Sequence, residues 1–237
     1  MPTLDGAVVL VTGANGGIGT ELVRGALERG ASKVYATARL PRDWDDERIV
    51  PLALDVTDPA SIAAVADAAR DVTVLINNAG TSVTNASILE QSDGEIRANI
   101  ETNYIGPLLL SRAFGPILVE HGAGMIINIH SALSWYAVAG AYSASKAAMW
   151  SATNSLRLDL DPQGVHVVGV HVGYVDTAMA AHTNDPKLDP ADLVRTVFDA
   201  AEAGEYEVLA DDTSVGLKSA LSAPVDALYP QLGAPVG

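Results

Sequence analysis

The chain has 237 residues, of which 49% are hydrophobic and 18% are charged, and its formal net charge is −15. This composition indicates a globular protein rather than a disordered one, with one large α/β domain or two small ones. The acidic balance disfavours nucleic acid as a partner, because both molecules would be negatively charged. The absence of Cys excludes disulfides, thiolate catalysis and cysteine-ligated metals.

Metal binding and membrane association are also disfavoured. The five histidines lack the spacing of a zinc motif such as H-E-x-x-H, so we expect no metal site. Residues Met1 to Gly6 lack the basic and apolar regions of a secretory signal. The most apolar run, Val165 to Val175, is too short to span a bilayer. We therefore expect a cytoplasmic protein that does not bind membranes.

The first apolar run, Ala7 to Thr12, has the length and composition of a strand buried on both faces of a parallel sheet. A glycine-rich segment, residues 13–19, follows directly, and a helical pattern then runs from Thr20 to Arg29. In this context glycines permit a tight turn against a pyrophosphate, whose charge the helix N-terminus stabilises. The sequence therefore predicts a dinucleotide site, although plain turns between a strand and a helix also contain glycines.

A second strand is predicted from Lys33 to Arg39. Its end lies about twenty residues after the last loop glycine, where an acidic residue would bind the ribose hydroxyls of NAD. Thr37 and Arg39 stand there instead, and a cation can pair with the 2′-phosphate of NADP. The sequence therefore favours NADP(H) over NAD(H). The competing interpretation is that Arg39 is a surface residue, and Asp43 follows soon after.

Strand and helix patterns continue to alternate along the chain, without a repeat or a linker. One Rossmann-like domain over residues 1–237 is therefore predicted, with a doubly wound parallel sheet of about seven strands and helices on both faces. The other predicted strands cover residues 49–54, 72–77, 125–130, 166–171 and 207–209. The other predicted helices cover residues 61–70, 92–121, 142–159, 191–203 and 214–229, with a junction at Gly106-Pro107 and an interruption at Pro224.

The stretch from Ser131 to Lys146 carries the candidate chemistry. Tyr142 and Lys146 lie four positions apart on a predicted helix, so their side chains share one face. An ammonium beside a phenol favours the phenolate, which predicts a pKa for Tyr142 below its usual value of about 10. Such a phenol can exchange a proton at working pH, and the Ser131 hydroxyl could bind the reacting oxygen. Tyr and Lys at this spacing also occur on helices without any activity.

Ligands of doubly wound sheets bind beyond the carboxyl ends of the strands. The glycine-rich turn, residues 77–80, Ser131 and residues 173–177 all follow predicted strands, so we expect them at one edge of the sheet. The polar residues 178–188 are a candidate lid or pocket wall. The substrate pocket is therefore predicted beside the loop from about residue 173 to residue 190.

Together these motifs resemble the short-chain dehydrogenase/reductase family over most of the chain. The resemblance is carried by Thr12-Gly-Ala-Asn-Gly-Gly-Ile-Gly19, Asn77-Asn-Ala-Gly80, Asn103, Ser131, Tyr142-x-x-x-Lys146 and Gly173-Tyr-Val-Asp-Thr177. It implies that Tyr142 is the general acid and that Ser131 polarises the substrate carbonyl. It also implies that Lys146 lowers the pKa of Tyr142 and holds the nicotinamide ribose, and that Asn103 holds a water for proton resupply.

The resemblance implies which residues bind the cofactor. These are Gly13, Asn15, Gly17, Ile18, Gly19, Thr37, Arg39, Asp55, Val56, Asn78, Ala79, Gly80, Tyr142, Lys146, Val175 and Thr177. Three positions depart from the family pattern: Asn15 replaces a basic residue of many NADP-preferring members, His130 replaces a Ser, and Val172 replaces a Pro. Family members are often tetramers, so we expect a homo-oligomer, either a homotetramer or a dimer.

The expected pocket wall is largely apolar and aromatic, with no cation placed for a carboxylate or phosphate. It comprises Ser131, Leu133, Trp135, Tyr136, Tyr142, Tyr174 and Met179. The sequence therefore predicts an NADP(H)-dependent carbonyl reductase or alcohol dehydrogenase that acts on a neutral ketone or aldehyde. The alternative is a cofactor-binding regulatory protein without turnover. A halohydrin dehalogenase is disfavoured, because Lys146 and the loop glycines are intact. A sugar epimerase is disfavoured, because epimerases usually show a different glycine spacing and a longer C-terminal region.

Overall fold

The computed structural model describes residues 3–82 and 87–233. Within these residues, seven strands form one sheet in the order β3-β2-β1-β4-β5-β6-β7, and all neighbouring strands are parallel. The strands are β1 (Val8–Thr12), β2 (Lys33–Ala38), β3 (Ile49–Ala53), β4 (Val74–Asn77), β5 (Gly124–Ile129), β6 (Val165–His171) and β7 (Glu207–Leu209). The predicted doubly wound sheet is confirmed, and its order reverses between β1 and β4.

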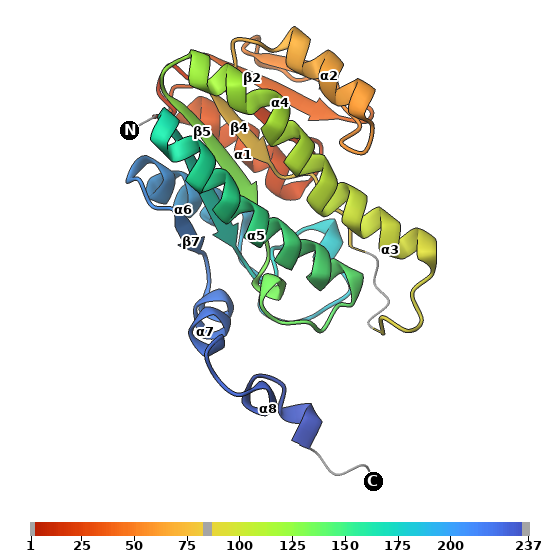
Figure 1. The fold of residues 1–237 in the computed structure, drawn as a ribbon. Helices are drawn as coiled ribbons and strands as arrows, with labels where there is room; N and C mark the ends of the chain where they lie inside the picture. The colour runs from red at the N-terminus through yellow and green to blue at the C-terminus, as the bar shows by residue number, and fades with distance from the viewer. Residues whose placement is uncertain (1–2, 83–86, 234–237) are drawn as a thin grey trace.

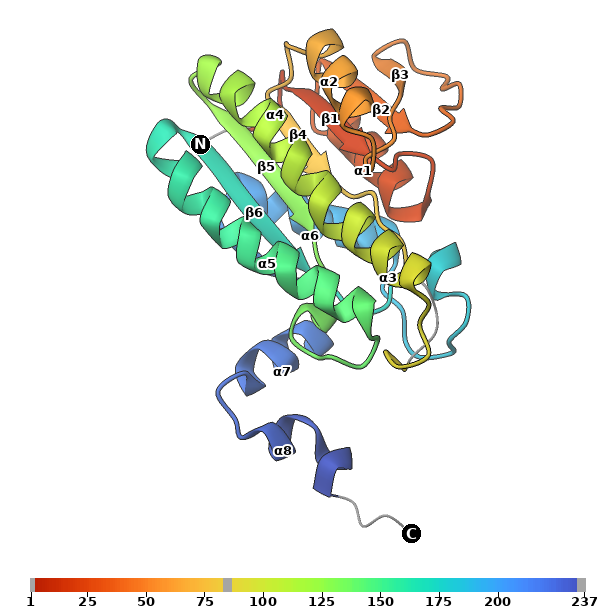
Figure 2. The same ribbon diagram turned by 45° about the vertical axis from the view of Figure 1, so that its right-hand side comes forward.

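Helices cover both faces of this sheet (Figures 1 and 2). Helices α1 (Gly17–Glu28) and α6 (Pro190–Glu202) bury apolar side chains against one face. Helices α2 (Pro59–Ala68), α4 (Gly106–Glu120) and α5 (Ala141–Leu160) do so against the other. The central strands β4, β5 and β6 are buried at every position. Their continuous apolar runs follow from this two-sided burial.

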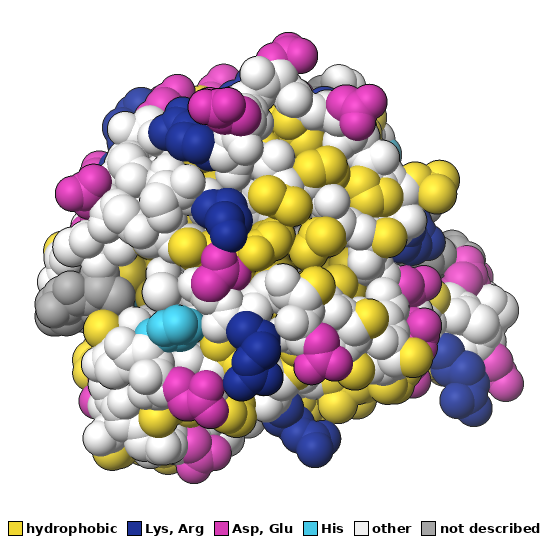
Figure 3. All heavy atoms as spheres, turned by 90° about the horizontal axis from the view of Figure 1, so that it is seen from above, with side chains coloured by type: hydrophobic (Ala, Val, Ile, Leu, Met, Phe, Trp, Pro, Cys, Tyr) yellow, Lys and Arg dark blue, Asp and Glu magenta, His cyan; other side chains and the backbone are white. Residues whose placement is uncertain are grey.

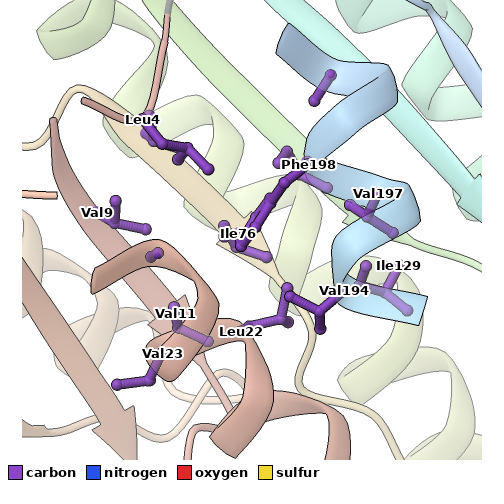
Figure 4. Close-up of a cluster of buried hydrophobic side chains, with 14 of the residues drawn as sticks. Leu4, Val9, Val11, Leu22, Val23, Ile76, Ile129, Val194, Val197 and Phe198 are labelled. Carbon is purple, nitrogen blue, oxygen red and sulfur yellow. The ribbon is translucent and has the colours of Figure 1, made fainter. Parts of the chain in front are cut away.

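The core under α1 and α6 is shown in Figure 4. Leu22 of α1 lies near Val194 of α6, Val23 and Phe198 belong to the same cluster, and all four side chains are buried. Gly25 lets the two helices approach closely, because a Cβ at this position would lie 2.7 Å from Cγ1 of Val194. The apolar stripe of α6 therefore holds α1, and with it the loop before α1, against the sheet.

The long helix predicted over residues 92–121 is divided by a π-helical turn, Glu101–Ile105, between α3 (Asp93–Ile100) and α4. Pro107 has no N–H for the Asn103 carbonyl four residues earlier. The N–H of Gly106 bonds to the Glu101 carbonyl five residues earlier, which widens the turn. The predicted junction at Gly106-Pro107 therefore takes the form of a π turn that carries Asn103.

The C-terminal helix predicted over residues 214–229 is two helices, α7 (Asp212–Ala220) and α8 (Val225–Leu228). The predicted interruption at Pro224 is present, but the break already begins after Ala220. Figures 1 and 2 show this segment leaving the body of the molecule. It is tied back by Tyr229, whose hydroxyl accepts the Ala137 N–H at 3.0 Å. Short 3₁₀ turns cover Ala132–Ser134, Asp161–Gln163, Ala178–Ala180 and Pro230–Gly233.

The surface combines charged and apolar areas. On the face shown in Figure 3, hydrophobic side chains gather near the centre and charged side chains of both signs surround them. Across the described parts of the chain, no helix is both long and apolar enough to cross a bilayer.

Phe198→Ala tests the packing of α6 on α1. Phe198 is fully buried, so we expect its truncation to lower the free energy of unfolding by about 3–5 kcal/mol through lost burial and a cavity. Urea denaturation followed by circular dichroism measures this change. Leu158→Ala is the control, because Leu158 is 79% exposed and its loss should change stability by less than about 0.5 kcal/mol. Equal effects of the two substitutions would contradict this description of the core.

Candidate active site

The glycine-rich loop between β1 and α1 needs glycine at specific positions. Gly13 has a φ of 67°, in the left-handed region that favours glycine. A Cβ at Gly17 would lie 2.5 Å from Cγ2 of Thr177, so a side chain there would push the loop away from residues 173–177. The first turn of α1 has no side-chain cap, which leaves its N–H groups facing outward as donors for an anion. This geometry fits a pyrophosphate.

Thr12 joins this loop to the end of β4. Its hydroxyl accepts the N–H groups of Asn78 and Ala79, both at 2.9 Å. The Asn78 side chain donates to the Thr12 carbonyl at 2.9 Å. These bonds hold the two strand ends together at the point where the sheet reverses its order. The role of Thr12 does not follow from a one-dimensional pattern, because its partners lie more than sixty residues away in the chain.

Two arginines lie beside the loop, where the adenosine end of a dinucleotide is expected. Arg39 is exposed, which is compatible both with phosphate binding and with the competing interpretation of a surface residue. The Arg42 guanidinium lies 4.0 Å from the Trp44 ring centroid and donates to the Thr20 hydroxyl at 3.2 Å. Asn15 ties the glycine loop to this segment by donating to the Leu40 carbonyl at 2.7 Å. Arg42 is a second candidate cation, and no spacing rule singles it out in the sequence.

Two predicted cofactor contacts lie next to these arginines. Thr37 is fully buried, and its hydroxyl donates to the Val11 carbonyl at 3.0 Å, so it supports the start of the loop. The Asp55 carboxylate accepts the backbone N–H and the hydroxyl of Thr57, at 2.9 and 2.7 Å. Those hydrogen bonds, and secondarily the charge of Arg39, lower the pKa of Asp55. Asp55 therefore remains an anion.

Three of the predicted catalytic side chains converge after β5. Ser131 follows β5, and its hydroxyl accepts the Leu133 N–H at 3.1 Å. Tyr142 lies in the first turn of α5, close enough to the Ser131 hydroxyl for that hydroxyl to lower the pKa of the phenol. The Lys146 ammonium lies 5.8 Å from the Tyr142 ring centroid and donates to the Ile129 carbonyl at 2.9 Å. The spacing of four on a helix therefore does place Tyr142 and Lys146 together.

The pKa of Tyr142 departs from the expectation. Burial raises this pKa, and the hydrogen bond with Ser131 offsets part of the rise. Lys146 is 6% exposed, and burial lowers the pKa of its ammonium to about 8. The direct partner of the ammonium is a backbone carbonyl, and Lys146 does not lower the pKa of the phenol. The prediction of a lowered pKa is therefore wrong, because desolvation dominates.

Asn103, on the π turn, lies at the back of this cluster. Its side-chain oxygen accepts the Thr81 N–H at 2.8 Å, and its amide nitrogen donates to the Ser145 hydroxyl at 3.0 Å. A Cβ at Gly80 would lie 3.3 Å from the Asn103 oxygen and 3.8 Å from the Lys146 nitrogen. The structure therefore brings Asn103, Gly80 and Lys146 together at one edge of the sheet.

The predicted pocket residues fall into two groups. Tyr174 and Met179 are 40% and 48% exposed, and the loop that carries them is closed at its base by a bridge between Val175 and Leu188. Trp135 is instead 5% exposed and packs behind Ser131. Tyr136 is half-buried and stacks on Tyr229, with ring centroids 5.1 Å apart. The outer half of the loop borders a polar hollow of about 470 Å³ lined by Asp176, Thr183, Asn184, Asp185, Lys187 and Asp189.

A glycine-rich loop before a helix and a Ser–Tyr–Lys cluster thus lie at the carboxyl edge of one parallel sheet. Across residues 3–82 and 87–233, no three His, Asp or Glu side chains are grouped to hold a metal ion. This arrangement defines a nucleotide-dependent oxidoreductase. A family model for short chain dehydrogenases matches residues 7–188. The chain belongs to the short-chain dehydrogenase family.

Similar proteins support the same assignment. The chain is 30% identical to the ketoacyl reductase HetN of Nostoc sp., over 91% of this chain and 82% of that protein. It is 34% identical to the 3-oxoacyl-[acyl-carrier-protein] reductase FabG of Vibrio cholerae, over 77% and 79%. A short-chain dehydrogenase from Burkholderia cenocepacia, solved in complex with NADP, is 38% identical over 99% of this chain and 100% of that one, with a TM-score of 0.91. A 21% identical NAD complex from Burkholderia phymatum, with a TM-score of 0.83, shares the fold.

The lowered pKa of Lys146 gives a pH dependence of stability. Between the folded-state pKa of about 8 and the ordinary value of 10.5, the unfolded chain binds more protons at Lys146 than the folded protein does. Stability relative to Lys146→Met should therefore rise as the pH rises through this interval. Urea unfolding of both proteins at about pH 7.5 and about pH 9.5 measures the difference. A difference that does not change with pH would contradict the lowered pKa.

Proposed function

We propose that the protein reduces a neutral ketone or aldehyde to an alcohol with NADP(H), and that it catalyses the reverse oxidation. The observation that carries this proposal is the grouping of Ser131, Tyr142 and Lys146 at one edge of the sheet: the Lys146 ammonium lies 5.8 Å from the Tyr142 ring centroid and 3.8 Å from where a Cβ at Gly80 would lie. The ketoacyl reductases among the relatives and the NADP complex of the 38% identical structure support it.

Different residues of the site would bind the pyrophosphate, the nicotinamide ribose and amide, and the adenine of the cofactor. The N–H groups at the start of α1 would bind the pyrophosphate, and Lys146 would bind the nicotinamide ribose. Thr177, packed against Gly17, would contact the nicotinamide amide, and Asp55 with Val56 would border the adenine. The bound cofactor supplies or accepts the hydride. The chain's own residues supply orientation and the proton.

Ser131 and Tyr142 would act on the same substrate oxygen. The Ser131 hydroxyl would donate a hydrogen bond to the carbonyl oxygen and hold it beside the Tyr142 hydroxyl. As carbon–oxygen double-bond character is lost, negative charge develops on that oxygen, and the phenol of Tyr142 transfers its proton there. The raised pKa of Tyr142 keeps the phenol protonated at neutral pH, which is the form that reduction requires.

After Tyr142 has given its proton to the substrate, Lys146 and the main chain of Asn103 would help to supply a new proton to Tyr142 from solvent. Pro107 cannot donate to the Asn103 carbonyl, which leaves this carbonyl as a natural acceptor for a water on the π turn. Such a water would connect the Lys146 ammonium to solvent. The Asn103 side chain is already fixed by Thr81 and Ser145, so it would position the turn rather than exchange protons itself.

The preference for NADP(H) would depend on both arginines beside the glycine loop. Neither Arg39 nor Arg42 forms an ion pair with a carboxylate of the described residues, whereas Arg48 is paired with Asp46. Trp44 fixes the plane of the Arg42 guanidinium, which reduces the entropy lost on binding a phosphate. Asn15, which stands where many NADP-preferring members have a basic residue, does not add to this preference; its amide donates to the Leu40 carbonyl.

The remaining features of the proposal concern the whole molecule. Residues 1–237 would form one domain, with the substrate between residues 131–142 and the loop near residues 173–190. Apolar side chains at Leu133, Tyr174 and Met179 favour a neutral substrate. The apolar area in Figure 3 would suit a homo-oligomer, either a tetramer or a dimer. The cytoplasmic location expected from the sequence stays a prediction.

Absorbance of reduced nicotinamide tests the reaction. The purified protein is mixed with NADPH or NADH and a panel of neutral ketones and aldehydes. We expect oxidation of NADPH, at a higher kcat/KM than for NADH. Cofactor binding without oxidation of either nucleotide across the panel would instead favour a regulatory protein that has no turnover.

Tyr142→Phe tests the proton donor. The substitution removes the hydroxyl and leaves the ring, so kcat should fall by a factor of at least about 10² while the Kd for NADPH stays within about twofold. Tyr206→Phe makes the same change at an exposed tyrosine bonded to Asp161 and serves as the control. Retention of a tenth or more of the rate by Tyr142→Phe would overturn its assigned role.

Arg39→Asp tests the cofactor preference. The carboxylate would repel a 2′-phosphate and accept ribose hydroxyls, so the ratio of kcat/KM for NADPH over NADH should fall by at least about tenfold. Arg70→Asp is the charge-matched control, since Arg70 pairs with Glu120 on the surface. If Arg39→Asp and Arg70→Asp both keep the original ratio of kcat/KM for NADPH over NADH, Arg39 does not bind the 2′-phosphate.

A further inference from the structure

Two buried histidines lie behind Ser131, and the proposed reaction does not use either of them. His130 directly follows β5, and His171 is the last residue of β6. Their side chains are almost inaccessible to solvent, and their ring centroids are 4.9 Å apart. Imidazole rings in such a position need hydrogen-bond partners, because an unpartnered buried polar group is costly. Their partners therefore indicate what each ring does.

His171 bonds to the main chain of Ser131. Its Nδ1 lies 3.2 Å from the Ser131 carbonyl oxygen, and a carbonyl can only accept, so Nδ1 carries the proton. The same oxygen accepts the Ser134 N–H at 3.0 Å. Burial lowers the pKa of His171 to about 4, so the ring is neutral at neutral pH and Nε2 carries no proton. One tautomer is therefore fixed.

His130 has a different partner. Its Nε2 lies 3.1 Å from the Thr153 hydroxyl, which donates its own hydrogen to the Met149 carbonyl at 2.8 Å. The hydroxyl therefore accepts from His130, and this ring ties β5 to α5 rather than to Ser131. Of the two histidines, His171 is the one that contacts the catalytic turn directly.

The ring of His171 also clamps the far end of the same turn. Trp135 stacks on it, with centroids 3.9 Å apart and planes inclined by 20°. The Lys218 ammonium of α7 lies 4.8 Å from the Trp135 ring centroid and 2.7 Å from a Glu207 carboxylate oxygen. The other Glu207 oxygen lies 3.6 Å from Nε2 of His171. His171 thus contacts both Ser131 and Trp135, and the Lys218–Glu207 ion pair packs against the Trp135 ring.

A comparison within β6 separates this arrangement from ordinary packing. His166, near the start of the strand, is also buried, bonds through Nε2 to the Glu205 carbonyl at 3.0 Å and packs on the Tyr206 ring. It therefore has the same kinds of contact at the opposite end of the strand. The difference is that the carbonyl bonded by His171 belongs to Ser131.

We propose that His171 is a positioning residue for Ser131: its Nδ1–H bond and its stack with Trp135 fix the turn so that the Ser131 hydroxyl meets the Tyr142 hydroxyl. The role rests on the proposed function, in which Ser131 binds the substrate oxygen. A displacement of about 1 Å in such a group can cost a factor of about 10² in rate. His171 does not touch the substrate oxygen itself.

Two substitutions separate positioning from packing. In His171→Asn, the amide nitrogen can occupy the place of Nδ1 and donate to the Ser131 carbonyl, whereas His171→Leu fills the site without a donor. We expect kcat to fall about tenfold or more in His171→Leu and less than about threefold in His171→Asn, with an unchanged Kd for NADPH. Thermal denaturation should give the opposite order, because Leu suits the buried site better than Asn.

His166→Leu is the matched control. It removes the same kind of bond from the same strand, so it should lower stability without lowering kcat by more than about twofold. A kcat that falls with stability across all three variants, whatever the donor, would overturn the proposal.

A measurement without turnover keeps the two proposals distinguishable. In histidine-labelled protein, ¹⁵N NMR should show His171 as the Nδ1–H tautomer, with a slowly exchanging proton. The Leu133 and Ser134 amide signals should shift in His171→Leu and stay near their original positions in His171→Asn. If the protein without substitutions oxidised no NADPH, the proposed reaction would be wrong. The NMR signals would still show whether His171 donates a hydrogen bond to the Ser131 carbonyl. An Nε2–H tautomer would refute the assignment of His171.

Discussion

The buried ammonium of Lys146 connects the sheet to the catalytic helix. It donates to the Ile129 carbonyl at the end of β5, and burial lowers its pKa to about 8. A buried cation with a single carbonyl partner is costly, so its retention needs an explanation beyond stability. The position of Lys146 beside Gly80 and Tyr142 agrees with the proposed role of this cation in binding the nicotinamide ribose. The strand order of the sheet reverses between β1 and β4, next to this cluster.

Several elements of the fold could be predicted because they depend on local pattern. Continuous apolar runs gave the strands, glycine spacing gave the phosphate loop, and the spacing of Tyr142 and Lys146 gave their common face. Other features depend on contacts between distant segments. The Thr12 hydroxyl accepts from residues that follow β4, and Arg42 donates to Thr20, which lies 22 residues earlier, so neither role has a signal in the local sequence.

The two main departures have physical causes. The spacing of four correctly placed the ammonium near the phenol, but the direction of the Tyr142 pKa depends on desolvation, which the sequence does not give. Trp135 follows Ser131 closely and has the character of a pocket residue, yet it turns inward because His171 offers a flat buried partner. In the long helix, Pro107 marked an irregularity, and the Glu101–Gly106 bond made it a π turn.

A single-turnover experiment tests the central claim most directly. Protein in excess over NADPH is mixed rapidly with a neutral ketone, and the reduced-nicotinamide absorbance is followed. The account predicts complete oxidation of the bound NADPH with formation of an equal amount of alcohol, and almost no oxidation when Tyr142 is replaced by Phe. Bound NADPH that stays reduced with every ketone and aldehyde tried, or equal oxidation by both proteins, would contradict it.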